Sequence, residues 1–87
     1  MKCSELKDGA SVVFKVQSDI FKKKVYMDGN VIHNNTDART MFVCYLDGYQ
    51  SRTETIPYED MVAVGREDGD MMKFDNISGK SVLLTAD

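Results

Sequence analysis

Tryptophan is absent from the 87-residue sequence, and proline, histidine and cysteine are scarce, with one, one and two residues respectively. No apolar run approaches the ~20 residues that a membrane-spanning helix needs. The amino-terminal stretch MKCSELKDG lacks the apolar segment of a secretory signal. These absences predict a cytoplasmic protein that has no membrane contact.

The residue types that usually carry catalysis or bind metals are also few. Cys3 and Cys44 are too few for a disulfide framework or a metal site, and we expect Cys44 to be buried and Cys3 to be incidental. His33 is alone and has the context of a polar residue at a strand end. Gly79-Lys80-Ser81 ends like a phosphate-binding loop, but Phe74 occupies the position of the required first glycine. The sequence therefore predicts no enzyme, no cofactor and no metal.

The composition is that of a small globular domain. Hydrophobic residues make up 43% of the chain and charged residues 29%, which is ordinary globular usage. A chain of this length buries enough surface for one modest core. We therefore expect a single domain over residues 1–87.

The charge balance argues against a general nucleic-acid binder. The net charge is −3 and the isoelectric point is about 5.0, whereas binding to phosphates needs a positive face. Lys22, Lys23 and Lys24 form a local basic patch. We interpret it as a solvated strand edge that blocks aggregation. A nucleic-acid-binding barrel that uses these lysines and nearby aromatic residues is the weaker alternative.

The stretch from Thr40 to Val64 organises the rest of the chain. Asp47-Gly48 lies between two strand-like runs and predicts a tight hairpin turn. Pro57 opens a single helical turn over residues 57–60, because proline fixes φ and would interrupt a central strand. A short strand, Met61–Val64, follows this turn.

The predicted hairpin has two distinguishable faces. A two-residue loop at Asp47-Gly48 puts alternate residues on opposite faces of the sheet. We expect Phe42, Cys44 and Leu46 to belong to the core, because they lie opposite Tyr49 or small residues. The predicted outer face is half-exposed and carries Met41, Val43 and Tyr45, opposite Gln50, Arg52 and Glu54.

Further strands are expected on both sides of this hairpin. Ser11–Val16 is rich in β-branched and aromatic residues. Lys22–Met27 and Val31–Asn34 are predicted to form a second hairpin that turns at Asp28-Gly29-Asn30. An acidic turn over residues 66–70 and a last hairpin, made of residues 71–74 and 81–85, complete the chain.

Several short strands, tight hairpins and a helical turn predict a mostly β fold, a small barrel or a rolled antiparallel sheet. The order of turns resembles the SH3-like small β-barrels, particularly the Tudor type. The segments that carry the resemblance are Leu6-Lys7-Asp8-Gly9, Asp28-Gly29, Tyr45-Leu46-Asp47-Gly48 and residues 56–62, IPYEDMV. The resemblance implies a barrel-like body over about residues 6–65, with residues 66–87 as an added C-terminal hairpin.

Tudor-type domains enclose methylated lysine or arginine in a cage of aromatic side chains through cation–π attraction. By this resemblance the four tyrosines, all beside predicted turns, become candidates for such a cage. Packing is the alternative role for them. These residues are Tyr26, Tyr45, Tyr49 and Tyr58.

Our leading functional hypothesis is a protein-binding or regulatory module, as a monomer or a homodimer, whose partner docks on the predicted outer face. Apolar rows with polar rims often mark interfaces. The candidate partner-binding residues are Met41, Val43, Tyr45, Arg52 and Tyr58.

The alternative hypothesis is a small acidic inhibitor of a nucleic-acid enzyme, such as a phage-type counter-defence protein. In that hypothesis, carboxylates occupy a basic groove that normally holds phosphates. The candidate carboxylates are Asp47, Glu54, Glu59, Asp60, Glu67, Asp68 and Asp70.

Overall fold

The computed structural model describes residues 1–68, 71–73 and 81–87, which form one antiparallel sheet. Two short 3-10 turns accompany the strands, and the described residues contain no α-helix and no helix able to span a bilayer. The mostly β prediction is confirmed. The elements are η1 (Cys3–Glu5), β1 (Ser11–Ser18), β2 (Lys23–Asn35), β3 (Thr40–Asp47), β4 (Gln50–Pro57), η2 (Tyr58–Asp60), β5 (Met61–Asp68), β6 (Met71–Lys73) and β7 (Ser81–Leu83).

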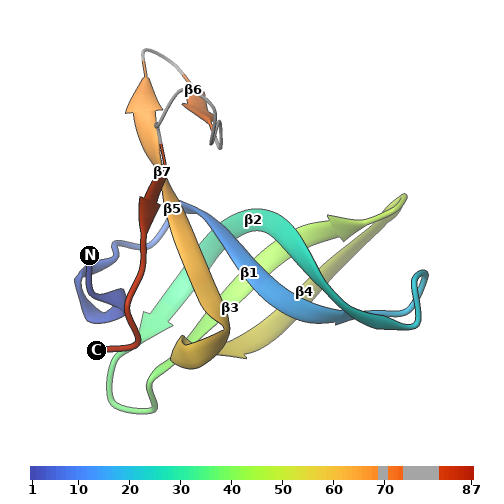
Figure 1. The fold of residues 1–87 in the computed structure, drawn as a ribbon, viewed down its shortest axis with the longest axis horizontal. Coiled ribbons are helices and arrows are strands. Elements are labelled where there is room, and N and C mark those ends of the chain that lie inside the picture. The colour runs from blue at the N-terminus through green and yellow to red at the C-terminus, as the bar shows by residue number, and fades with distance from the viewer. Residues whose placement is uncertain (69–70, 74–80) are drawn as a thin grey trace.

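The strand order is β4-β3-β2-β1-β5-β6, and β7 also pairs with β5 (Figure 1). The first four strands form a meander in which each strand pairs with the next. The chain then makes η2, as Pro57 predicts, and returns as β5 beside β1. No ladder between β4 and β5 is found in the described part of the chain, so the sheet is not closed. This arrangement is compatible with a small barrel-like fold.

Strand β2 is long and strongly bent, and it joins the two halves of the sheet (Figure 1). Its first part pairs with β1 and its last part with β3. The predicted turn at Asp28-Gly29-Asn30 is therefore wrong. A Cβ atom at Gly29 would collide with the backbone carbonyl oxygen of Cys44. The glycine permits this close approach of β3, which is another use of glycine within a strand.

The predicted hairpin of β3 and β4 is confirmed, but its loop is displaced by one residue. Asp47 pairs with Gln50, so the two loop residues are Gly48 and Tyr49. Gly48 has φ +65° and Tyr49 does not have a positive φ. Positive φ at the first loop residue alone, with glycine there, is the pattern of a type II′ turn, whose twist matches that of the flanking strands.

The predicted faces of β3 are reversed. Met41 and Val43 are fully buried and Tyr45 is nearly so, whereas Phe42 and Leu46 are exposed. The one-residue displacement of the loop leaves the same residues of β3 together on each face. The error therefore lies in which of the two faces was expected to be buried. Arg52 and Glu54 share the buried face with Tyr45 and Val43. They belong to the edge strand, where polar side chains reach solvent, so they do not mark the outer face.

The core lies on the inner side of the bent sheet. Tyr45 packs edge to face against Phe14, with ring centroids 5.4 Å apart. Cys3, which we expected to be incidental, is fully buried and belongs to this core. Burial raises the pKa of its thiol. The buried apolar side chains are Cys3, Leu6, Val12, Phe14, Val16, Val31, Met41, Val43, Tyr45, Ile56, Tyr58, Met61, Ala63 and Val64.

The C-terminal part differs from the predicted separate hairpin. β5 continues to Asp68, so the acidic turn predicted to begin at residue 66 is wrong for residues 66–68, and residues 69–70 lie outside the described part. β6 and β7 both pair with β5. The turn predicted at residues 76–79 also lies outside the described residues. The chain then runs back to the amino terminus, where the backbone N–H of Cys3 donates to the Thr85 carbonyl at 3.0 Å.

Candidate protein-binding surface

Two hairpin tips meet at the end of the molecule opposite the termini (Figure 1). One tip connects β1 to β2 and the other connects β3 to β4. The Ser18 hydroxyl donates to Asp47 Oδ1 at 2.8 Å, and the Asp19 backbone N–H donates to Asp47 Oδ2 at 3.1 Å. A Cβ atom at Gly48 would run into Cδ1 of Ile20. The two tips therefore form one structural unit.

The Asp47 carboxylate is the centre of this unit. Asp47 and Ser18 are both fully buried, and a buried carboxylate is tolerated only when hydrogen bonds compensate its lost hydration. The Ser18 hydroxyl also accepts a bond from the Phe21 backbone N–H at 3.1 Å. The Lys22 N–H donates to the Ser18 carbonyl at 2.9 Å. Asp47 thus binds Ser18 and Asp19 directly, and Ser18 in turn binds the backbone of Phe21 and Lys22.

An ion pair adds a second link between the tips. Arg52 on β4 lies 2.7 Å from the carboxylate of Asp19, and this carboxylate is the main cause that raises the pKa of Arg52. Burial raises the pKa of Tyr45, and the nearby Arg52 guanidinium partly opposes that change. Arg52, a predicted partner-binding residue, is therefore engaged within the chain.

Three apolar side chains project from the joined tips into solvent. Ile20 and Phe21 come from the β1–β2 loop, and their exposed fractions are 50% and 60%. Tyr49 comes from the β3–β4 loop and is fully exposed. We call Ile20, Phe21 and Tyr49 the tip surface. Exposed apolar side chains that gather at one place on a protein often mark a site of protein interaction.

The predicted basic patch lies directly beside the tip surface. Lys22 and Lys23 are exposed, and neither forms an ion pair with any residue that the structure describes. Lys24 is 3.4 Å from Asp60 and is partly neutralised. Lys22 has φ +59°, a left-handed conformation that is uncommon for residues other than glycine. The patch therefore has two unpaired positive charges next to Phe21.

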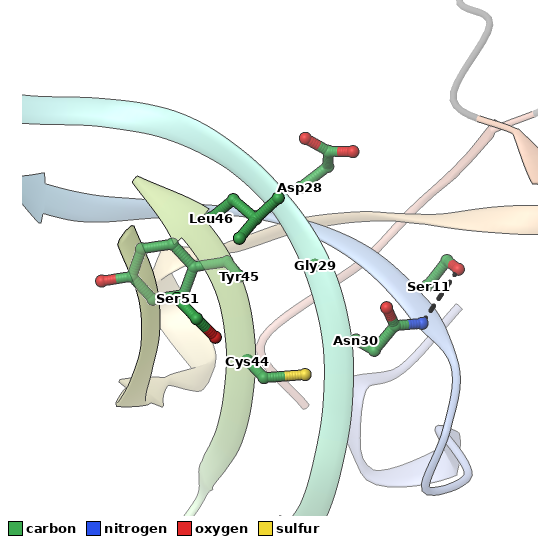
Figure 2. A pocket seen from close by; sticks show the side chains of 8 residues that line it. All are labelled: Ser11, Asp28, Gly29, Asn30, Cys44, Tyr45, Leu46 and Ser51. Atoms are coloured by element: carbon green, nitrogen blue, oxygen red, sulfur yellow. Dashed lines mark hydrogen bonds between the residues drawn. The ribbon is translucent and has the colours of Figure 1, made fainter. Parts of the chain in front are cut away.

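An open groove of about 410 Å³ crosses the outer side of the sheet near the β3–β4 tip. Figure 2 shows Leu46 and Asp28 at one end of this groove, and Asn30 with Ser11 at the other. The Asn30 amide donates to the Ser11 hydroxyl at 3.3 Å. Hydroxyl, amide and carboxylate groups line the groove together with one exposed leucine. The lining residues are Ser11, Asp28, Gly29, Asn30, Cys44, Tyr45, Leu46 and Ser51.

None of the predicted partner-binding residues belongs to the tip surface. Met41, Val43 and Tyr45 are in the core, so the prediction of an accessible apolar row is wrong. Tyr58 is buried, and its hydroxyl donates to Asn34 Oδ1 at 2.6 Å. Burial is the main cause that raises the pKa of Tyr58.

The four tyrosines do not form a cage. Tyr45 packs on Phe14, and Tyr58 is buried with the guanidinium of Arg39 5.6 Å from its ring centroid. Tyr49 is on the tip surface. The fourth tyrosine, Tyr26, is exposed on β2 with the Lys15 ammonium 5.6 Å from its ring centroid.

The predicted acidic face is only partly present. Glu54 and Glu59 are exposed, but Asp47 is buried and Asp60 is half-buried and paired with Lys24. The side chains of residues 67 and 68, and all of residue 70, lie outside the described part. Within that part, no group of three or more His, Cys, Asp or Glu residues is arranged to hold a metal ion.

Sequence reasoning missed the tip surface. Ile20 and Phe21 lie between two predicted strands and directly precede three lysines. A tight link between strands has little room to bury two large side chains, and this was the available signal. The burial of Asp47 had no local signal, because its partner Ser18 is 29 residues away.

Comparison of the chain with protein-family models, with curated proteins and with solved structures gives no match.

Proposed function

We propose that this chain is a non-enzymatic protein-binding module with an SH3-like small-barrel architecture, and that its partner docks on the tip surface. The observation that carries the proposal is the exposure of Ile20, Phe21 and Tyr49 on a backbone ordered by the buried Asp47 carboxylate.

The strand arrangement supports the SH3-like assignment. A four-stranded meander is followed by a 3-10 turn, and β5 then pairs with β1. The bent β2 pairs with both β1 and β3, as expected when one long strand is shared by two halves of a rolled sheet. The absence of the predicted tyrosine cage argues against the methyl-lysine or methyl-arginine ligands of the Tudor type.

The chemistry of the tip surface favours a protein segment with both apolar and acidic side chains. Aromatic residues contribute most of the binding energy at many protein interfaces. The unpaired charges of Lys22 and Lys23 stand at the margin of this surface, where they favour and orient an acidic partner. The order imposed by Asp47 reduces the entropy lost on binding.

Two other functions have less support. An acidic inhibitor of a nucleic-acid enzyme would rely on exposed carboxylates, and of the described candidates only Glu54 and Glu59 are exposed. A nucleic-acid-binding barrel would use Lys22, Lys23 and Phe21 together, by phosphate contacts and base stacking. Strongly salt-sensitive binding to a nuclease would favour the first alternative. A low-salt gel shift that Phe21→Ser abolishes would favour the second.

The proposal is tested by comparing two surface variants as baits. The double variant Phe21→Ser/Tyr49→Ser removes two aromatic side chains of the tip surface. The matched control, Tyr26→Ser, removes an exposed tyrosine that lies opposite Lys15 in the β1–β2 ladder, outside the two loops. Both should melt within a few degrees of the native chain, because substitutions at exposed positions seldom change stability by more than ~0.5 kcal/mol.

We expect at least one protein captured from source-cell lysate by the native chain and by Tyr26→Ser to be lost with the double variant. With that protein purified, the double variant should bind at least about tenfold more weakly, which corresponds to ~1.4 kcal/mol. If every captured protein binds the double variant as well as it binds the control, the tip surface is not the docking site.

A further inference from the structure

Strand β4 forms one edge of the sheet. Its eight residues, Gln50–Pro57, pair with β3 on one side, and no other strand of the described chain pairs with them. An open hollow lies against its first half, lined by residues 50–53. An unpaired edge presents backbone N–H and C=O groups that another strand can pair with.

The charges of this edge are arranged symmetrically about one residue. Arg52 and Glu54 flank Thr53 and lie on the same face of the strand. Glu54 is exposed and has no ion-pair partner among the described residues, and Arg52 is half-exposed. If two copies of β4 pair antiparallel with Thr53 opposite Thr53, each Arg52 lies opposite Glu54 of the other copy. Opposite charges at directly opposed positions stabilise an antiparallel pair.

Other registers of the same pairing are disfavoured. A shift by two residues puts either Arg52 opposite Arg52 or Glu54 opposite Glu54, and like charges directly opposed destabilise a sheet. Pro57 has no N–H and ends the pairing segment. The remaining residues, Gln50–Ile56, are centred on Thr53, so one register satisfies both the charges and the length of the edge.

We propose that β4 is a homodimer interface, in which a second copy of this chain pairs antiparallel about Thr53 and extends the sheet across both copies. Ser51 then lies opposite Thr55 of the other copy, an exposed pair of hydroxyl residues. The proposal is independent of the tip surface. The competing interpretation, that the charges only protect the edge from aggregation, predicts a monomer.

A charge exchange at exposed positions tests the interface. Ser51→Lys/Thr55→Lys and Ser51→Glu/Thr55→Glu each put like charges opposite one another in the proposed dimer. Neither variant changes Arg52, whose ion pair with Asp19 supports the tips. In sedimentation velocity, we expect the native chain to be dimeric and each variant to dissociate about tenfold more readily. An equimolar mixture should associate again, because Lys then faces Glu.

A disulfide measures the register directly. Cα atoms of directly opposed residues are roughly 4.5–5.5 Å apart, within the range that a disulfide bridges. Thr53→Cys should therefore form a dimer-linking disulfide. Thr55→Cys should not, since the two copies of residue 55 would be roughly 13 Å apart. Both variants need Cys44→Ser, because Cys44 lies opposite Thr53 within the same chain.

Three outcomes would overturn the proposal. They are a native chain that stays monomeric at the highest concentration at which it is soluble, a mixture of the Lys and Glu variants that associates no better than either alone, and cross-linking of Thr55→Cys as fast as that of Thr53→Cys. Melting temperatures of the variants close to the native value separate loss of the dimer from loss of the fold.

Discussion

Replacement of Asp47 by alanine should strongly destabilise the fold, although aspartate beside a turn glycine is usually a solvated residue. The Asp47 carboxylate is fully buried and accepts bonds from the Ser18 hydroxyl and the Asp19 N–H. Each hydrogen bond to a charged group contributes about 1.5–3 kcal/mol. Because relaxation and water entry recover part of the free energy of these two bonds, we expect Asp47→Ala to lower the free energy of unfolding by about 2–4 kcal/mol. That is a large share of the stability of a small domain.

The assay is chemical denaturation at neutral pH, with Asp28→Ala as the matched control. Asp28 is an exposed aspartate on β2, so its replacement should change the free energy of unfolding by less than about 0.5 kcal/mol. A double-mutant cycle with Ser18→Ala isolates the pair, and we expect the two losses to be non-additive by about 1 kcal/mol. If Asp47→Ala loses no more than Asp28→Ala, or if its loss adds to that of Ser18→Ala, the buried network does not hold the tips.

Three further predictions concern the rest of the fold. Val43→Ala should lower the free energy of unfolding by about 2–3 kcal/mol and Phe42→Ala by about 1 kcal/mol. A larger loss for Phe42→Ala in thermal melts would mean that Phe42, and not Val43, lies in the core. Tyr58→Phe should lose about 1 kcal/mol with its bond to Asn34. Because burial raises the pKa of Tyr58, the contribution of Tyr58 to native stability should be constant below pH ~10 and fall above it as the unfolded tyrosine ionises; in pH-dependent denaturation, Tyr58→Phe should show a shallower fall of stability above that pH. Lys22→Gly should stabilise the chain by about 0.5–1 kcal/mol, because glycine adopts the positive φ of residue 22 without strain. An unchanged or lower melting temperature would show that residue 22 does not have this conformation.

Features set by nearby residues were the ones that the sequence predicted well. The strands, the hairpin near Asp47-Gly48 and the 3-10 turn after Pro57 all follow from the conformational preferences of neighbouring residues. Even there, the turn was displaced by one residue. The type II′ geometry needs glycine at the first loop position, which makes Tyr49 the second loop residue.

Features set by distant contacts were predicted poorly, and Gly29 is the clearest case. Asp28-Gly29 and Asp47-Gly48 are the same dipeptide, but only the second is at a turn. What distinguishes them is the Cys44 carbonyl, which approaches Gly29 from β3, and no local pattern contains that contact. The candidate site depends on similar contacts, because Asp47 orders Phe21 through Ser18 from another hairpin.

The two proposals together predict a bivalent molecule. In a dimer paired antiparallel through β4, Gln50 of each copy lies beside Ile56 of the other, so the two tip surfaces are at opposite ends of the joined strands. A partner displayed at high density can then engage both surfaces, and the second contact is strengthened by effective concentration. We therefore expect Ser51→Lys/Thr55→Lys to bind a densely immobilised partner at least about tenfold more weakly than the native chain, while its affinity for the same partner free in solution is unchanged. An equal loss in both formats would mean that β4 itself contacts the partner, and equal binding in both would mean that the dimer does not present two usable tip surfaces.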